Sequence, residues 1–512
     1  MFRIDTRGKR FFDEAHRERI FSGINMVFKG EPGSQESSRN NYIPSWKEED
    51  IRKLRDCGFN VVRLGLIWDG VEPEPGKYDE KYLDWIEKIL NYCKEYELYA
   101  YLDMHQDLFS CLYSDGAPQW ATITDGMPHV KCELWSDSYL LSDAVKRAFD
   151  NFWLNAPAFD GIGVQDHYAN MWCHVAERFS SHPAVIGFDF LNEPYPGSSG
   201  FDIFGTLIGA FTEISNNLTN EKHTIEEMMD VFSDEQKKFK ALKLLEEKEV
   251  YKAMASASEP LVREFDRGVL ASFYKKMRDA LRKVTNKGII FIENCYFSNL
   301  GIECQSTPII GDNGEHEPLQ AFSPHGYDLV VDTDAVIYAS NKRVDVIFGS
   351  HKNAQQRMNL PVLVGEWGAH GNNREGLEHV RHLIDIFEEN LWSNTYWCYT
   401  DGFDKLPVLN VLKRGYPQAV AGELINYHFD MLTGSFEMSW VEDPGIKEPT
   451  IVYLPYLPEG KNIQCQGEYY IRKVSPDSDS CYLYIKSEAP GKRFLKVGCK
   501  NDKRKSPGIQ KF

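Results

Sequence analysis

The stretch VIGFDFLNEP, residues 185–194, places an apolar run directly before Asn192, Glu193 and Pro194. A continuous apolar run of this length is typical of a strand that is covered on both faces. A carboxylate at the end of such a strand is partly removed from water, which is unfavourable unless it has a partner or a task there. The stretch therefore predicts a buried strand that brings an amide and a carboxylate side by side to a functional site.

Seven other runs of the same kind occur along the chain, with amphipathic helical stretches between them. A strand–helix alternation repeated eight times predicts an α/β protein with a (β/α)8 TIM barrel. An open doubly wound sheet is the alternative, but no glycine-rich phosphate loop follows any of the runs, which weakens that alternative. The eight expected strands are residues 20–27, 59–67, 98–105, 185–193, 288–293, 319–325, 361–367 and 393–400.

The chain of 512 residues is long enough for a large barrel and a smaller module. We expect the catalytic barrel to span residues 1–424, with long insertions near 106–165 and 195–260 that form lids or walls of a binding site. For the second insertion, a solvent-exposed decoration is the alternative. Short strand-like segments separated by turn residues predict a C-terminal antiparallel β-sandwich over residues 425–505.

The composition limits the partners and the compartment. A formal net charge of −18 lacks the basic footprint of a protein that binds nucleic acid. The 11 cysteines form no C-x-x-C pair, which favours free thiols in a reducing compartment. The charged N-terminus has no apolar core of a signal peptide. We expect a cytoplasmic protein, or a secreted or membrane-associated one if a leader has been removed; the oligomeric state stays open.

Ionisable and aromatic residues gather at the ends of the predicted strands. In a TIM barrel the catalytic groups come from the C-terminal ends of the strands, so these residues are expected at one mouth of the barrel. They are Lys29 after the first strand, Arg63 in the second, Asp103, His105 and Asp107 at the third, Asn192 and Glu193 at the fourth, His325 and Tyr327 at the sixth, Glu366 at the seventh and Trp397 in the eighth.

Two of these residues, Glu193 and Glu366, are expected to face each other across the mouth. Two carboxyl groups about 5–5.5 Å apart support retaining glycoside hydrolysis, in which one attacks the anomeric carbon and the other protonates the leaving oxygen and later activates water. A neighbouring like charge raises the pKa of one of them and keeps it protonated. We expect Arg63, His325 and Tyr327 to hold the nucleophile as an anion.

Several motifs resemble a known family. NEP at 192–194 and GEWG at 365–368 resemble glycoside hydrolase family 5, and the likeness extends to Arg63, His105, His325, Tyr327 and Trp397. GINMVFK, WDGVEPEPGKYD, YLDMHQDLFS, GAPQWA and the β-rich C-terminus resemble its endoglycoceramidase branch. The resemblance implies cleavage of the β-linkage between the glycan and the ceramide of glycosphingolipids. It implies Glu193 as acid/base, Glu366 as nucleophile, and Lys29, Asp103, His105, Asp107, Asn192, Tyr327 and Trp397 as substrate-binding residues, with Arg63 and His325 in support.

Other readings remain open. The alternatives are a glucosylceramidase or galactosylceramidase that removes single sugars, a family 5 glucanase or mannanase, and a carbohydrate-binding protein without activity. No metal or organic cofactor is expected, since two carboxylates suffice. The apolar segment 200–214 is expected to accommodate ceramide or to contact a membrane or micelle surface; a helix packed on the barrel is the alternative. Glu293 is expected to support the site rather than react.

Overall fold

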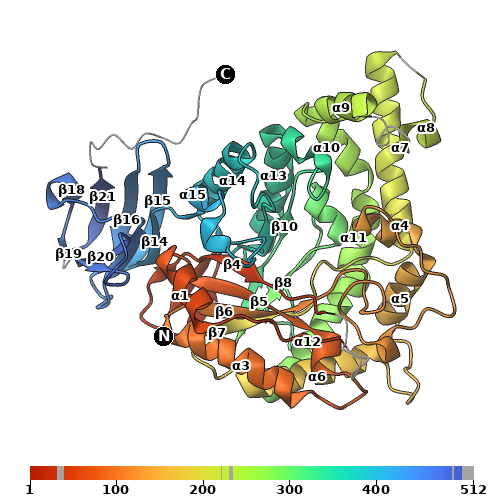
Figure 1. The fold of residues 1–512 in the computed structure, drawn as a ribbon, viewed down its shortest axis with the longest axis horizontal. Helices are drawn as coiled ribbons and strands as arrows, with labels where there is room; N and C mark the ends of the chain where they lie inside the picture. Colours follow the sequence, from red (N-terminus) through yellow and green to blue (C-terminus); the bar gives the residue numbers. More distant parts are fainter. Residues whose placement is uncertain (32–39, 221, 230–234, 487–488, 499–512) are drawn as a thin grey trace.

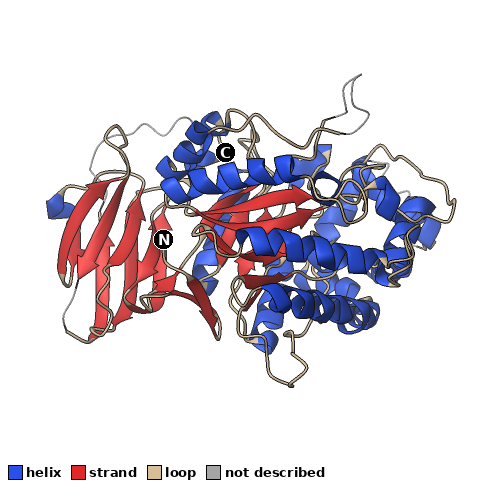
Figure 2. Cartoon of the chain, turned by 90° about the horizontal axis from the view of Figure 1, so that it is seen from below, coloured by secondary structure: helices blue, strands red, loops and turns tan. Residues whose placement is uncertain are grey.

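The computed structural model describes residues 1–31, 40–220, 222–229, 235–486 and 489–498. A barrel covered by helices occupies one part of the molecule, and two antiparallel sheets occupy the other (Figure 1). Figure 2 shows the same division, with the N-terminus beside the sheets rather than at the far end of the barrel.

The barrel is an eight-stranded parallel sheet that closes on itself. Its order is β11-β13-β4-β5-β6-β7-β8-β9, and a bridge between Phe322 and Val362 joins the two outer strands. Beyond these, β10 (His325–Gly326) and β12 (Glu366–Trp367) continue the sixth and seventh positions of the ring as a parallel pair. The strands of the ring are β4 (Ser22–Met26), β5 (Val61–Ile67), β6 (Tyr99–His105), β7 (Val185–Asp189), β8 (Ile289–Ile292), β9 (Gln320–Phe322), β11 (Leu363–Val364) and β13 (Ser393–Tyr396).

The apolar runs form strands here because helices cover their outer face. All seven residues of β5 and of β6 are buried, as expected for strands that have side chains of the barrel interior on one face and helices on the other. The covering helices present apolar stripes to the sheet, and most of their charged residues lie on the opposite face. They are α1 (Glu48–Asp56), α3 (Glu80–Glu95), α6 (Val164–Phe179), α12 (Ala271–Val284), α13 (Asn341–Met358) and α14 (Leu377–Asn390). Arg343 of α13 and Glu388 of α14 are buried exceptions.

The second part of the molecule is a β-sandwich with its own core. Apolar residues of both sheets, among them Phe436, Trp440, Val452 and Leu483, form one buried cluster. The larger sheet has the order β1-β2-β3-β14-β17-β20-β19, and the smaller has the order β15-β16-β21-β18. The strands are β1 (Ile4–Arg7), β2 (Arg10–Asp13), β3 (Glu18–Arg19), β14 (Tyr416–Val420), β15 (Gly422–Asp430), β16 (Ser435–Glu442), β17 (Thr450–Leu454), β18 (Ile463–Cys465), β19 (Glu468–Lys473), β20 (Cys481–Lys486) and β21 (Gly491–Val497).

The two long insertions form helices on the side of the barrel away from the sandwich (Figure 1). The first insertion contributes α4 (Ser138–Leu141) and α5 (Asp143–Trp153). The second contributes α7 (Ser199–Thr219), α8 (Ile225–Met229), α9 (Glu235–Leu244), α10 (Lys248–Ala257) and α11 (Glu259–Phe265). In the part of the chain that the structure describes, every helix is too short or too polar to span a bilayer.

The barrel and the sandwich confirm the predicted fold class, but the extent of each part differs from the sequence expectation. The sandwich begins with β14 at Tyr416 rather than at residue 425, and the N-terminal strands β1–β3 belong to its larger sheet, not to the barrel. Ile4 and Phe11 of these strands also join the apolar cluster that fills the barrel at the N-terminal ends of its strands. Residues 499–505 of the expected module lie outside the described residues.

Candidate active site

Arg63, on β5, is the charged centre of the barrel mouth. Its side chain has no exposed surface. Burial alone would lower the pKa of a guanidinium, but the surrounding carboxylates hold the pKa of Arg63 well above its ordinary value. Arg63 donates to Glu366 Oε1 (2.7 Å), Glu293 Oε1 (2.7 Å), Asp189 Oδ2 (3.0 Å) and Asn192 Oδ1 (3.0 Å), and its Nη2 lies 2.9 Å from Asp103 Oδ1.

Glu366 is held from two sides. It begins β12, and the register of β12 with β10 places Glu366 opposite His325. Arg63 donates to its Oε1, and the hydroxyl of Tyr327 donates to its Oε2 at 2.8 Å. Two donors and a buried cation stabilise the ionised form of a carboxyl group. Glu366 therefore accepts from two donors, one of them a buried cation.

Glu193 lies beyond the strand that was expected to carry it. β7 ends at Asp189, and Glu193 lies in the following turn with φ of 46°, a conformation that residues other than glycine rarely adopt. Its Oε1 accepts from Asn299 Nδ2 at 2.9 Å and lies 3.0 Å from His325 Nδ1. The short strand and the turn place the carboxyl group over the barrel mouth instead of in the wall.

The two glutamates lie close together and differ in their surroundings. An oxygen of Glu193, an oxygen of Glu366 and a ring nitrogen of His325 all lie within 4.8 Å of one another. Burial raises the pKa of Glu193 to about 7, and the charges of Glu366 and Glu293 act in the same direction, against His325. At neutral pH one carboxyl group of the pair can therefore carry a proton.

A cavity of about 170 Å³ opens above this pair. Trp397 lines it and lies parallel to the ring of His105, with 5.3 Å between the ring centroids and 15° between the planes. The ammonium of Lys29 lies 5.2 Å from the ring centroid of Trp397 and 5.6 Å from that of Trp135. Aromatic and polar groups thus line the same cavity. Its other lining residues are Asp107, Ser136, Asn192, Glu193, Tyr296, Asn299, Leu300, Tyr327, Val331, Asp332, Glu366 and Ala369.

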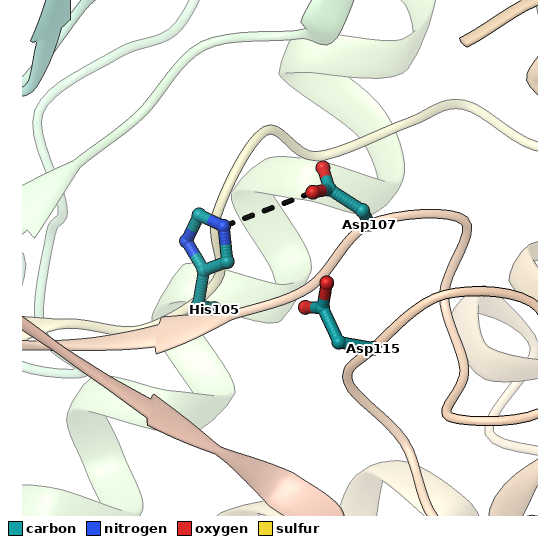
Figure 3. A group of neighbouring side chains, drawn as sticks. All are labelled: His105, Asp107 and Asp115. Atoms are coloured by element: carbon teal, nitrogen blue, oxygen red, sulfur yellow. Dashed lines mark ion pairs between the residues drawn. The ribbon is translucent and has the colours of Figure 1, made fainter. Parts of the chain in front are cut away.

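His105, Asp107 and Asp115 form a group beside the cavity (Figure 3). His105 ends β6, while Asp107 and Asp115 come from the loop that follows, and His105 Nε2 lies 3.9 Å from Asp107 Oδ2. Burial lowers the pKa of His105 to about 3, so the imidazole is neutral at neutral pH. Lys29, which follows β4, donates to Asp107. The group therefore offers both donors and acceptors to a polyhydroxylated ligand.

Asp103 does not reach the cavity. It has no exposed surface, and its Oδ2 lies 2.9 Å from His105 Nδ1. The expected direct contact of Asp103 with a sugar is therefore not supported. Two residues apart on one strand, Asp103 and His105 point to the same face, and Asp103 lies behind the imidazole, where it fixes the orientation of the ring.

Three side-chain groups at the mouth bring metal-ligand atoms within 4.8 Å of one another: His105, Asp107 and Asp115; Glu193, His325 and Glu366; and Asp103, Asp189 and Glu293. In each group a cation of the chain already contacts a carboxylate. Lys29 contacts Asp107, and Arg63 contacts Glu366, Glu293 and Asp189. Cationic side chains of the protein thus neutralise carboxylates in all three groups. That the site works without a metal stays a prediction.

The sequence did not point to several side chains that line the cavity, among them Asn299 and Trp135. Asn299 donates to Glu193 from a short 3-10 helix after β8, and Trp135 comes from the first insertion. Neither residue lies at a strand end or in a motif that resembles the family, and these are the two signals that the sequence offers. The aromatic-rich composition of the first insertion was the one indication that could have pointed to Trp135.

The comparisons with known proteins agree with this geometry. The family model described as Cellulase (glycosyl hydrolase family 5) matches residues 22–402, and the glycoside hydrolase family 5 C-terminal domain matches residues 414–497. The chain belongs to glycoside hydrolase family 5. It is a glycoside hydrolase, and it groups with the endoglycoceramidases of this family.

Among its relatives in family 5, an endoglycoceramidase of Hydra vulgaris is 33% identical, over 94% of this chain and 86% of the relative. An endoglycoceramidase of Cyanea nozakii is 26% identical, over 86% of this chain and 81% of the relative. The solved structure of endo-glycoceramidase II from Rhodococcus sp., in a cellobiose-like imidazole complex, superposes with a TM-score of 0.71 at 23% identity, over 96% of this chain and 99% of that one. The structural likeness supports the family 5 fold of both parts of the chain.

Proposed function

We propose that this chain hydrolyses the β-glycosidic bond between the glycan and the ceramide of glycosphingolipids, with retention of configuration. One observation carries the mechanism: the oxygens of Glu193 and Glu366 lie within 4.8 Å of each other around His325. Retaining glycosidases have closely spaced carboxyl groups, whereas inverting enzymes keep them about 6.5–9.5 Å apart to admit water between them. The endoglycoceramidase relatives support the lipid substrate.

In the first step Glu366 attacks the anomeric carbon while Glu193 protonates the departing oxygen of ceramide. The bond from the anomeric carbon to that oxygen breaks, and an ester between the sugar and Glu366 forms. Arg63 and Tyr327 donate hydrogen bonds to the two oxygens of Glu366 and orient it before the attack. Burial, which raises the pKa of Glu193 to about 7, keeps the proton available to the leaving group.

In the second step a water molecule takes the place of ceramide. Glu193, now ionised, accepts a proton from the water, whose oxygen attacks the anomeric carbon and releases Glu366. Two displacements restore the original configuration of the sugar. The neighbouring His325 compensates the charge of Glu193 in the intermediate, since its Nδ1 lies 3.0 Å from Glu193 Oε1.

The cavity wall supplies the contacts to the sugar. The amide of Asn192 donates one hydrogen to the carbonyl of Gln106 at 3.1 Å and keeps a second for a hydroxyl group of the sugar. Trp397 offers an apolar face to the ring, and Lys29 and Asp107 offer a donor and an acceptor at its edge. We therefore assign these four residues and His105 to substrate binding.

We also propose that the insertions contact the membrane or micelle that contains the substrate. Among the described residues, half of the exposed large apolar side chains belong to the two insertions. Trp135 lines the cavity and begins the 3-10 helix that directly precedes α4. Helix α4 carries Leu141 and packs against α7, which carries Phe201. Leu141 and Phe201 are 51% and 52% exposed. Exposed apolar side chains that continue from a lipid-cleaving site suit a lipid surface.

Azide tests the assignment of the nucleophile. Glu366→Gly should lose turnover of the glycolipid, because no carboxylate is left to form the ester. With an activated aryl β-glycoside, azide should enter the vacated space and give the α-glycosyl azide, which nuclear magnetic resonance identifies. Glu193→Gly, as the matched variant, should give the β-azide because Glu366 still reacts first. The same anomer from both variants would overturn the assignment.

A further inference from the structure

Glu293 is a third carboxylate that contacts the surroundings of both proposed catalytic glutamates. It follows β8 directly, and it is 2% exposed. Its backbone N–H donates to the hydroxyl of Tyr274 at 2.7 Å, which anchors the residue below the mouth. Glu293 is not among the side chains that line the cavity. Its charge therefore acts on the site through the residues that it contacts.

The two oxygens of the Glu293 carboxylate contact different parts of the site. Its Oε2 accepts the backbone N–H of Glu193 at 2.7 Å, and its Oε1 accepts from Arg63 Nη2 at 2.7 Å. The same Oε1 lies 3.3 Å from Nε2 of His325, whose other nitrogen faces Glu193. Glu293 thus contacts the acid/base in two ways. It accepts from the backbone N–H of Glu193, and it lies against His325, which contacts the carboxyl group of Glu193.

The backbone contact coincides with an unusual conformation. Glu193 has φ of 46°, in the left-handed region that is unfavourable for a residue with a Cβ. A charge-assisted hydrogen bond to the amide of that residue offsets such a cost. The negative charge also favours the imidazolium form of His325, and the nearby carboxylates, Glu293 first among them, raise the pKa of His325 well above its ordinary value despite burial.

We propose that Glu293 is a positioning residue for the acid/base: it fixes the turn that carries Glu193 and keeps His325 as the donor to it. This inference rests on the proposed function, in which Glu193 protonates the leaving group. Asp189 provides a matched comparison. It is a buried carboxylate that also accepts from Arg63, at 3.0 Å, but its hydrogen bonds among the described residues include none to Glu193 or His325.

Two substrates separate the acid/base from the rest of the site. A glycolipid has a poor leaving group that needs a proton, whereas a 2,4-dinitrophenyl β-glycoside of the same glycan does not. We would measure kcat/KM, which reports the first displacement, for both substrates with the wild type, Glu293→Gln, Asp189→Asn and Glu193→Gln. The amide of Glu293→Gln can accept from Glu193 or face Arg63 with its oxygen, but not both, and it carries no charge.

General acid catalysis contributes on the order of 10²–10⁴-fold, and this sets the expected size of the effect. For Glu293→Gln, kcat/KM should fall on the order of 10²-fold with the glycolipid and less than about ten-fold with the dinitrophenyl glycoside. Asp189→Asn acts through Arg63 on Glu366 and should lower both values by similar factors. Glu293→Asp keeps the charge with a shorter reach, so it should show a smaller loss of the same selective kind.

Equal losses with both substrates for Glu293→Gln, or no loss with either, would overturn the inference. Thermal unfolding of each variant identifies a folding defect, and Glu293→Asp decides the matter if Glu293→Gln does not fold. Glu193→Gln separates the two levels of the argument. If Glu193→Gln itself shows no preference for the activated substrate, the proposed role of Glu193 fails. If Glu193→Gln shows this preference and Glu293→Gln does not, only the inference about Glu293 fails.

Discussion

The carboxyl group of Glu193 illustrates how a single position acquires its chemistry from its neighbours. The same side chain in water would be ionised at neutral pH. Here burial raises its pKa to about 7, while Glu366 accepts hydrogen bonds from Arg63 and Tyr327. Two identical residue types thus have different surroundings, because one faces two donors, one of them a cation, and the other is mainly desolvated.

This difference predicts the pH dependence of the reaction. Glu193 must carry its proton to act as the acid, and the proton is present below a pH of about 7 and lost above it. We therefore expect kcat/KM for a glycolipid to fall as the pH rises through about 7. With a dinitrophenyl glycoside the fall should be weaker, because the leaving group needs no proton. Identical alkaline limbs for both substrates would contradict the assignment of Glu193.

At the scale of elements, β3 links the sandwich to the barrel. Arg19 of β3 is buried, donates through Nε to the carbonyl of Gln418 in β14 at 2.7 Å, and pairs with Asp13 at 3.2 Å. Its guanidinium also lies 5.2 Å from the ring centroid of Tyr99, at the start of β6. Arg19 therefore connects the N-terminal strands and β14 of the larger sheet with the barrel at the N-terminal ends of its strands.

Removal of this side chain should destabilise the fold. Arg19→Ala removes buried hydrogen bonds to Asp13 and to the carbonyl of Gln418, while Arg17 stays paired with Asp13 at 2.9 Å. A hydrogen bond that involves a charged group contributes about 1.5–3 kcal/mol. We expect a decrease of that order in the free energy of unfolding, measured by denaturant titration. Arg3→Ala, at an exposed ion pair of 3.9 Å with Asp5, should change it by less than about 0.5 kcal/mol. Similar values for the two variants would contradict the structural role of β3.

The elements also show what the sequence could and could not predict. Continuous apolar runs predicted all eight barrel strands, because burial on both faces leaves a clear local pattern. The places of Arg63 within one run and of His325 and Glu366 at the ends of two others predicted that these residues lie together at the barrel mouth, where Arg63 contacts Glu366. The pairing of β3 with β14 left no such pattern, since periodicity reports that a segment is buried but not which segment covers it. For the same reason the turn conformation of Glu193 and the contact from Asn299 had to come from the structure.

At the scale of the whole molecule, the sandwich and the insertions lie at opposite ends of the barrel (Figure 1). The C-terminal ends of the parallel strands point toward the insertions, and the cavity opens there, because Trp135 of the first insertion lines it. A lipid surface can therefore approach the insertions without contact with the sandwich. This arrangement suits an enzyme whose substrate stays anchored by its ceramide while the glycan enters the barrel mouth.

The proposed membrane contact predicts a specific loss. Leu141→Asp and Phe201→Asp should weaken binding to phosphatidylcholine vesicles that contain a glycosphingolipid, since each buried apolar side chain contributes about 1.5–3 kcal/mol. Cleavage of a soluble aryl glycoside should stay unchanged. Leu432→Asp, at a 77% exposed position of the sandwich, serves as the control and should bind like the wild type. Flotation of vesicles measures the effect, and equal binding by all variants would contradict the contact.

The most direct test of the central claim is a substrate panel read by mass spectrometry. Purified protein in detergent would be incubated with glucosylceramide, galactosylceramide, lactosylceramide, a ganglioside, and a soluble cellulose derivative or mannan, with Glu366→Gln as the control for background cleavage. We predict free ceramide together with the intact glycan from at least one glycosphingolipid, and neither product from the variant. Cleavage of the polysaccharide alone, with every glycolipid intact, would contradict the account.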